Sequence, residues 1–466
     1  GQSDLAKLVN EVIEKYNVLV VSAAGNVGPG INTVASPADA DGAISVGAFV
    51  SPRMWQVDFD YRVPKDSLYY FSSVGPRKDG AWYPTLVAPG SAVSTVPRWM
   101  GHDYLLTEGT SMATPYVSGV AAHLLENAAK NNIKVTPALI KRAMEESARN
   151  LTHFKEVEDG HGVLDAYNAW LKLKELNSER KIKVDIFNPQ FRSGPGIFAR
   201  EYLPAQLNLK LKNDDVVDYH LEWQASESWI KPLFKTTHIM RKSERDIPLA
   251  FELPDKPGIY SGVLVGNDPK YKGTEVEIPI NIIVGERVHE KPQRQSTHLN
   301  KLEAAQLARY FVYVPEGTTG INAKLEVFPD TSSAYQGRGR LHLINPFGFE
   351  EKMSEYAGEN PGLFGRKGWV ELTTFFPVTG TWEVVVYSSA ALSTYNLQET
   401  KYELTLELGE ILDFSEEIDP HLELIMSPLP EKAFAKSGGT VILHLWDNNQ
   451  NKPYSGALEV NGQLYQ

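Results

Sequence analysis

The sequence has no cysteine among its 466 residues. Disulfide bonds, thiolate metal sites and cysteine nucleophiles are therefore excluded. It also has no apolar run long enough to span a bilayer. Acidic residues outnumber basic ones, and the formal net charge of −12 argues against nucleic acid or an anionic membrane surface as a main partner. With 42% hydrophobic and 22% charged residues, the composition is that of ordinary globular domains, and the length predicts several of them.

The first part of the chain alternates helical patterns with buried strands. Ser3 is an N-cap candidate for a helix that closes at Asn17. The apolar run from Val18 to Ala24 has the length of a strand and is typical of a central parallel strand covered on both faces. A second strand is predicted from Ala43 to Phe49. This order of helix, buried strand and glycine-rich loop predicts an α/β domain with a parallel sheet over residues 1–176.

The chemistry is concentrated in the stretch Thr107–Ala122. Gly109-Thr110-Ser111 forms a turn signal that leads into an apolar helix predicted from Met112 to about Ala129, with Pro115 in its first turn. A serine at a helix N-terminus lies where unpaired N–H groups and the positive end of the helix dipole stabilise negative charge. This position suits a nucleophilic serine whose attack generates an oxyanion.

The segment Gly109–Ala122 resembles the nucleophile motif of subtilisin-like serine proteases, and the resemblance implies that Ser111 is the nucleophile. Thr114 fits the family pattern before the proline. Tyr116 departs from it, because the family usually has histidine there, and the departure is not expected to abolish activity. The resemblance is strong over residues 17–169 and weak beyond them.

The segment Ala23–Asn26 resembles the part of the same family that carries the oxyanion-hole asparagine. The resemblance implies that the Asn26 amide and the Ser111 backbone N–H together hold the oxyanion of the tetrahedral intermediate. Taken alone, Asn26 with the following Gly28 is also explained as an ordinary turn. The substrate-binding residues that the resemblance implies are Ala23, Ala24, Gly25, Ala35, Gly109 and Thr110.

A serine hydrolase of this type needs a histidine base that is oriented by an aspartate. The residues before Asn26 contain one aspartate, Asp4, and no histidine. His123 follows Ser111 by twelve residues on the same predicted helix, about 18 Å along its axis, and cannot reach it. His102 and His161 are better explained as solvated or packed histidines. The aspartate and histidine are therefore expected from an upstream portion of the same protein.

After residue 182 the pattern changes to short alternating strands separated by turn signals. Such spacing predicts an antiparallel sandwich over residues 182–285, which resembles fibronectin-III-like modules. A polar linker leads to a β domain over residues 299–409 that resembles jelly-roll accessory domains. Residues 420–466 are predicted to start a further β unit.

Three functions stay open at this stage. Segments such as Ser51–Trp55 and Ser94–Trp99 resemble the tripeptidyl-peptidase II and pyrolysin-like branch of the family. The main prediction is an endopeptidase acting on polypeptides; the alternatives are an exopeptidase of the tripeptidyl-peptidase II type and a non-catalytic fragment whose β domains mediate binding or assembly. The resemblance favours a secreted or cell-envelope protein, with the cytoplasm as the alternative, and leaves oligomerisation open.

No cofactor is expected for catalysis, and no group of residues has a convincing metal-ligand spacing. One acidic group falls near the end of the chain and consists of Asp413, Glu416, Glu417 and Asp419. Its composition is more typical of a solvated acidic loop than of a calcium site. A structural calcium ion elsewhere is left open.

Overall fold

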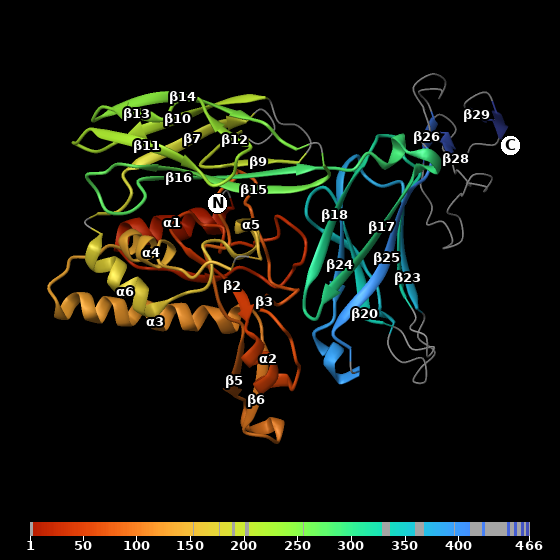
Figure 1. Ribbon diagram of the computed structural model, residues 1–466, viewed down its shortest axis with the longest axis horizontal. Coiled ribbons are helices and arrows are strands. Elements are labelled where there is room, and N and C mark those ends of the chain that lie inside the picture. Colours follow the sequence, from red (N-terminus) through yellow and green to blue (C-terminus); the bar gives the residue numbers. More distant parts are fainter. Residues whose placement is uncertain are drawn as a thin grey trace.

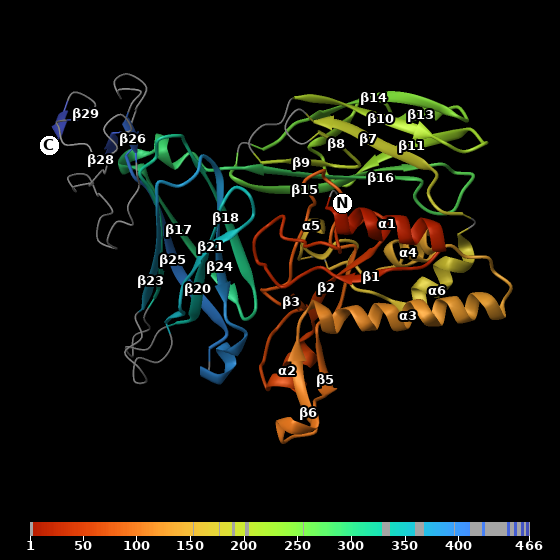
Figure 2. The ribbon, with the colours of Figure 1, turned by 180° about the vertical axis from the view of Figure 1, so that it is seen from behind.

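The computed structural model places three units side by side (Figures 1 and 2). Residues 3–176 form an α/β unit, strands β7 to β16 form a first β unit above it in Figure 1, and strands β17 to β25 form a second β unit to its right. The described residues are 3–151, 153–176, 178–188, 192–200, 205–254, 256–328, 336–358, 368–395, 397–410, 422–424, 445–447, 452–453, 458–460 and 463–465.

The α/β unit is built on a small sheet around the strand β2. Every residue of β2 is buried. Strands β1 and β4 pair with β2 in parallel, and β3 pairs with it in antiparallel orientation. Strands β5 and β6 form a separate hairpin that leads into α3. The elements are α1 (Asp4–Tyr16), β1 (Val21–Ala23), β2 (Ile44–Val50), α2 (Pro52–Phe59), β3 (Ser67–Leu68), β4 (Leu86–Pro89), β5 (Ser91–Thr95), β6 (Tyr104–Glu108), α3 (Thr110–Lys130), α4 (Pro137–Glu145), α5 (Glu156–Asp159) and α6 (Ala166–Glu175).

Local capping residues set the ends of these helices. The Ser3 Oγ accepts the Ala6 N–H at 3.1 Å, and Asn17 ends α1 in the left-handed conformation. At α4, the Thr136 Oγ1 accepts the Leu139 N–H at 3.2 Å. The Ser3 N-cap and the Asn17 stop confirm the sequence prediction.

Two predictions for this unit were wrong in detail. The helix α3 begins at Thr110, two residues earlier than predicted, so Pro115 lies in its second turn and inside the helix. Since proline has no N–H, the carbonyl of Ser111 loses the helical partner that residue 115 would supply. The run Val18–Ala24 contributes only three residues to β1, although the Val20 carbonyl also accepts the Ile44 N–H at 2.9 Å. Among the described strands β1 is half-buried and lies at the edge of the sheet, and not at its centre as predicted.

The first β unit consists of two five-stranded sheets that share one apolar core. Strand β10 alternates exposed and buried residues along its whole length, as expected for a sheet with one face on the core. One sheet has the order β12-β14-β10-β7-β8 and the other β13-β11-β15-β16-β9. The strands are β7 (Ile182–Asn188), β8 (Arg192–Gly194), β9 (Ile197–Ala199), β10 (Gln206–Asn213), β11 (Tyr219–Ala225), β12 (Ile230–Pro232), β13 (Thr236–Ile239), β14 (Ser243–Phe251), β15 (Gly258–Asn267) and β16 (Val276–Val284).

The second β unit also has two sheets over a common core, in which Trp382 is 1% exposed. The sheets have the orders β17-β25-β19-β23 and β18-β24-β20-β21, with β22 on β20. Its strands are β17 (Gln295–Glu303), β18 (Leu307–Val314), β19 (Gly320–Val327), β20 (Arg338–Ile344), β21 (Glu350–Met353), β22 (Ala357–Gly358), β23 (Trp369–Phe375), β24 (Gly380–Ser388) and β25 (Glu399–Leu408). The predicted domain boundaries and the fibronectin-III-like and jelly-roll assignments stay predictions.

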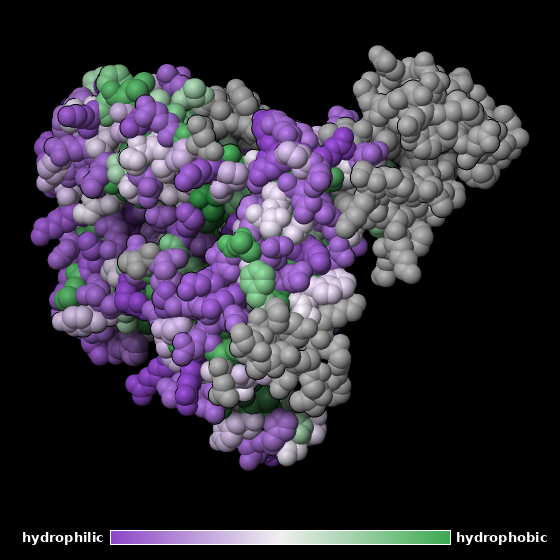
Figure 3. Space-filling model, turned by 45° about the vertical axis from the view of Figure 1, so that its right-hand side comes forward, coloured by the Kyte–Doolittle hydropathy of each residue, from purple (hydrophilic) through white to green (hydrophobic). Residues whose placement is uncertain are grey.

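The predicted last β unit lies largely outside the described residues, as does the acidic group Asp413, Glu416, Glu417 and Asp419. Its described strands are β26 (Leu422–Leu424), β27 (Leu445–Asp447), β28 (Lys452–Pro453), β29 (Leu458–Val460) and β30 (Gln463–Tyr465). None of the described helices is both long and apolar enough to cross a membrane. On the face in Figure 3, hydrophilic residues prevail and hydrophobic ones lie in small separate groups.

Candidate active site

Ser111 is the second residue of α3 and is exposed to solvent. The preceding Gly109 ends the turn after β6, and the Met112 N–H donates to its carbonyl at 2.9 Å. Among the described residues, nothing accepts a hydrogen bond from the Ser111 N–H, which is one of the unpaired donors of the first helical turn. The positive end of the α3 dipole adds to the attraction for negative charge at this point.

Asn26 follows the carboxyl end of β1 and reaches the same helix terminus. Its Oδ1 accepts two hydrogen bonds from Thr110, one from the backbone N–H and one from Oγ1, both at 3.0 Å. Both hydrogen bonds use the Oδ1 atom, so the carbonyl oxygen of the Asn26 amide is already bonded within the protein. Within the described part of the chain, the Nδ2 group has no hydrogen-bond acceptor, so it is available as a donor.

Gly109 connects the two donors. A Cβ atom built on this glycine would lie 3.4 Å from the Asn26 Nδ2 and 3.7 Å from the Ser111 backbone nitrogen. The two N–H donors therefore flank one small space, which a side chain at position 109 would occupy. An oxyanion hole needs two preorganised donors aimed at a common point.

The residues predicted to bind substrate are brought together around this space only in part. Gly25 donates its N–H to the Thr110 Oγ1 at 3.3 Å, and the Ala35 N–H donates to the Ala24 carbonyl at 2.9 Å. A Cβ on Gly25 would lie 3.4 Å from the Ala35 Cβ, so these two predicted wall residues are neighbours. Ala23 is half-buried, whereas Ala24 is 0% exposed and presents no side chain to a ligand.

Ser73 is a residue of this site that the sequence did not indicate. It lies under the glycine before Asn26, where a Cβ on Gly25 would come within 2.8 Å of its Oγ. The Ser73 N–H donates to the Gly25 carbonyl at 2.9 Å, and its Oγ accepts from the Val27 N–H at 3.3 Å. Ser73 thus fixes the backbone on both sides of Asn26. Because it lies 47 residues further along the chain, its contacts with the segment around Asn26 could not be predicted from neighbouring residues.

None of the described histidines hydrogen-bonds to Ser111. His102 lies at the tip of the β5–β6 hairpin, and the five extended residues of β6 place it about 16 Å or more away. His123 has 79% of its side chain exposed and pairs with Glu126 on the solvent side of α3. The His161 side chain is 9% exposed and is bonded to other groups. The described residues therefore bring the predicted nucleophile and the predicted oxyanion donors together, and no described histidine is bonded to Ser111.

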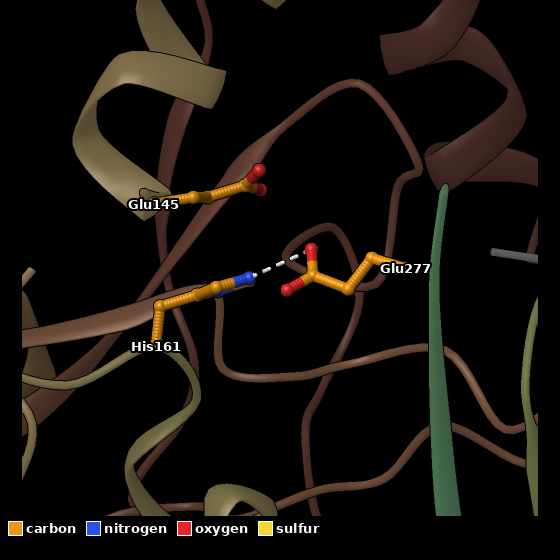
Figure 4. Close-up of side chains that lie close together, drawn as sticks. All are labelled: Glu145, His161 and Glu277. Atoms are coloured by element: carbon orange, nitrogen blue, oxygen red, sulfur yellow. Dashed lines mark hydrogen bonds and ion pairs between the residues drawn. The ribbon is translucent and has the colours of Figure 1, made fainter. Parts of the chain in front are cut away.

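His161 belongs to a buried cluster where the α/β unit meets the first β unit (Figure 4). Glu145 at the end of α4, His161 and Glu277 on β16 point toward one another, with candidate ligand atoms within 4.8 Å. The His161 Nε2 pairs with the Glu277 carboxylate at 3.2 Å, while its Nδ1 lies 2.8 Å from the Thr85 carbonyl. Three such side chains could hold a metal ion.

Arg180 argues against a metal at this place. Its guanidinium lies 2.7 Å from a Glu145 oxygen and 3.0 Å from a Glu277 oxygen, so both carboxylates already have a cationic partner. Burial by itself would lower the pKa of His161, but the carboxylates of Glu277 and Glu145 outweigh it and raise the pKa to about 9. We therefore interpret the cluster as an ion-pair network that joins the two units.

This network predicts a pH-dependent stability. The pKa of His161 rises from 6.5 to about 9, so its contribution is complete below pH 6.5 and is lost as the pH rises through 9. For Glu277, burial would raise the pKa, but His161 and Arg180 lower it from 4.5 to about 2; its contribution is complete above pH 4.5 and is lost as the pH falls through 2. The network is expected to be strongest between pH 4.5 and 6.5.

The measurement is the difference in melting temperature between the wild type and His161→Ala as a function of pH. It should be largest in that window and shrink above pH 9. The buried carboxyl of Asp159, whose pKa burial and Glu158 raise to about 8, titrates in both proteins and largely cancels in the difference. The exposed His123→Ala is the matched control and should have no such profile. A His161→Ala difference that is constant with pH would contradict the prediction.

A serine at a helix N-terminus, with an asparagine amide beside it at the carboxyl end of a parallel strand, is the arrangement by which a serine hydrolase stabilises an oxyanion. Comparison with known families agrees with this class. Residues 1–167 match the model described as the subtilase family, Peptidase_S8, and the chain therefore carries a subtilase domain. The match covers both Asn26 and Ser111.

The proteins to which the chain is similar include pyrolysin and tripeptidyl-peptidase 2. It is 32% identical to pyrolysin of Pyrococcus furiosus over 66% of this chain and 24% of that protein. It is 28% identical to tripeptidyl-peptidase 2 of Drosophila melanogaster over 69% of this chain and 24% of that protein. A crystal structure of tripeptidyl peptidase 2 has a TM-score of 0.68 and covers 91% of this chain and 34% of that one at 22% identity, which shows a shared fold. The chain spans about a quarter of the length of these two curated relatives.

Proposed function

We propose that the protein is a serine peptidase that cleaves polypeptides through an acyl-enzyme on Ser111. The Ser111 Oγ attacks the peptide carbonyl carbon while a base removes its proton, and the carbonyl oxygen becomes an oxyanion. The amine leaves with that proton, and water then releases the acid and restores Ser111. The observation that carries the proposal is the common space between the Asn26 Nδ2 and the Ser111 N–H, where the oxyanion would lie.

The base is the missing part of this mechanism. Since Ser111 has no histidine partner among the described residues, we propose that the histidine and its aspartate come from an upstream portion of the same protein, as the family resemblance implies. A sequence preceding Gly1 with one Asp-Ser/Thr-Gly and one His-Gly-Thr segment would support this.

The direct test uses the full-length protein and a fluorophosphonate probe, which reacts with an activated serine. The probe is expected to label Ser111, as identified by peptide mapping. Absence of labelling in a correctly folded full-length protein would overturn the proposal.

Asn26→Ala is expected to lower turnover by about 10²–10³-fold, the effect of removing one oxyanion-hole donor in subtilisin, a related enzyme. The binding of substrate should change little, because the donor acts on charge that develops in the transition state. Steady-state kinetics of the full-length variant test this. Asn10→Ala, on α1 with its side chain bonded to Gly42 and Asp41, is a control outside the site. A turnover within tenfold of the wild type for Asn26→Ala would contradict the assigned role.

Two modes of cleavage fit the similarities about equally. We propose an endopeptidase, and the alternative is an exopeptidase of the tripeptidyl-peptidase II type, which the similarity to tripeptidyl-peptidase 2 favours. An exopeptidase that releases tripeptides must bind the free N-terminal amine. Peptides with a blocked N-terminus therefore separate the two: internal cleavage of blocked and free peptides alike supports the endopeptidase, and cleavage of free peptides alone supports the exopeptidase.

The alternative from another class is a non-catalytic fragment. In this case the β units would bind substrate protein, the cell envelope or sister subunits. Deleting residues from 182 onward and measuring activity and assembly separates such a role from stabilisation. Three further proposals rest on the family resemblance alone: a secreted or envelope location, oligomer formation and a structural calcium ion.

A further inference from the structure

The segment that follows Asn26 is held by the second β unit, far away in sequence. We call residues 26–31 the oxyanion loop. The Ile31 N–H donates to the Glu383 Oε2 at 2.9 Å, across a separation of 352 residues. The Arg309 guanidinium donates to the Pro29 carbonyl. Glu383 lies on β24 and Arg309 on the adjacent β18, which faces the α/β unit in both views (Figures 1 and 2).

These two side chains form the centre of a buried charge network. Arg309 is within 2.5 Å of a Glu383 oxygen and within 3.1 Å of a Glu158 oxygen on α5. Arg200 of the first β unit lies 3.7 Å from the other Glu383 oxygen. The Glu383 side chain is 0% exposed and that of Arg309 is 7% exposed. Burial disfavours the charged form of Arg309, but Glu383 and Glu158 outweigh it and raise its pKa.

Apolar contacts hold the same segment from the same side. Ile31 is 0% exposed and packs in a cluster with members from all three units. A Cβ on Gly30 would lie 3.0 Å from the Ile344 side chain at the end of β20, so that strand end touches the loop directly. The members of the cluster are Ile31, Val157, Phe198, Ile283 and Phe311, with Ile259 against it.

The loop is held at its start, in its middle and at its end. At its start, Asn26 is bonded to Thr110 at the N-terminus of α3. In the middle, the Val27 N–H donates to the Ser73 Oγ at 3.3 Å and the Gly28 N–H donates to the Phe71 carbonyl at 2.8 Å. At its end, Pro29 and Ile31 are bonded to Arg309 and Glu383. A buried ion pair is seldom a net source of stability over well-packed apolar groups. Here the ion pair also makes two contacts with the backbone of the loop, and these suggest another role for it. The Glu383 carboxylate accepts an N–H and the Arg309 guanidinium donates to a carbonyl, and apolar side chains could do neither.

We propose that Glu383 and Arg309 are positioning residues for the Asn26 oxyanion donor, so that the second β unit takes part in catalysis by fixing the oxyanion loop. The inference rests on the proposed function of Asn26 and Ser111. An oxyanion donor displaced by a fraction of an ångström to 1 Å weakens its contact with the transition state, which costs up to about 10²-fold in rate.

The test compares Glu383→Ala with Glu275→Ala in the full-length protein. Glu275 is also buried and pairs with Arg142 at 2.9 Å between the α/β unit and the first β unit, but it does not touch the oxyanion loop. Glu383→Ala loses the ion pairs with Arg309 and Arg200, and Glu275→Ala loses the ion pair with Arg142, so each variant removes a buried carboxylate that takes part in a contact between units. Rates are normalised to the natively folded fraction. Glu383→Ala is expected to lower kcat by about 10–100-fold with KM nearly unchanged, and Glu275→Ala to leave the normalised kcat near that of the wild type.

Amide hydrogen exchange gives a readout that does not depend on activity. Peptides that cover residues 26–33 should exchange faster in Glu383→Ala than in the wild type, and should not do so in Glu275→Ala. Unchanged exchange there, or faster exchange with an unaltered normalised kcat, would overturn the positioning role. A parallel loss of kcat in both variants would also overturn it. A wild type that hydrolyses no peptide would contradict the proposed function, and the exchange data would still decide whether Glu383 holds the loop.

Discussion

Ser111→Ala in the full-length protein is expected to reduce turnover by about 10⁶-fold, the loss measured when the nucleophile of subtilisin, a related enzyme, is removed. The substitution deletes the Oγ atom that is proposed to form the acyl-enzyme. It leaves the Asn26 amide and the residue-111 backbone N–H in place, so a residual rate about 10³–10⁴-fold above that in water is expected from oxyanion stabilisation and binding. Peptide hydrolysis under single-turnover and steady-state conditions measures both.

Ser118→Ala is a matched control for this prediction. Ser118 lies two turns further along α3, is exposed, and bonds only to the Thr114 carbonyl at 3.2 Å among its described neighbours. It should keep the wild-type rate. If Ser111→Ala keeps a rate within tenfold of the wild type, Ser111 is not the nucleophile, and another residue must carry the chemistry.

The parts of the fold that depend on neighbouring residues could be predicted from the sequence. Ser3, Asn17 and Thr136 act through hydrogen bonds or backbone conformations that involve three or four residues, so their pattern is visible locally. The start of α3 could not be predicted as well. There the Gly109 carbonyl accepts the first bonds of the helix, and Asn26, 84 residues earlier, accepts the Thr110 N–H, a contact that no local pattern indicates.

In the candidate site too, some residues could be predicted from the sequence and others could not. Ser111 and Asn26 were indicated because each stands in a short motif. Their relation to one another follows from pairing in the sheet and from the space at Gly109, which only the structure reveals. Ser73 and Glu383 had no local signal, since each acts on the backbone of a segment that is distant in the sequence. Glu383 stands in β24, where every residue is buried, and no neighbouring residue in the sequence indicates which groups its carboxylate would bind.

The stretch Gly1–Gln466 produced alone is expected to be inactive toward peptides and to regain activity only with the upstream portion of the protein. Without a base, the Ser111 hydroxyl stays protonated and is a poor nucleophile near neutral pH. No described histidine is bonded to Ser111: His161 is held by Glu277 and Thr85, and His123 points to solvent. The oxyanion donors alone would leave about 10³–10⁴-fold catalysis over water, far below the rate of a working protease.

The sheet adds a second reason to expect a difference between the two proteins. Among the described strands β1 pairs only with β2, so its other edge offers unpaired backbone N–H and C=O groups to any partner. The stretch alone should therefore aggregate at concentrations where the protein with its upstream portion stays dispersed, as light scattering and size-exclusion chromatography can measure. Adding the upstream portion should restore both dispersal and hydrolysis. Hydrolysis by Gly1–Gln466 alone at near full-length rates, abolished by Ser111→Ala, would mean that His102 or another residue of this stretch is the base.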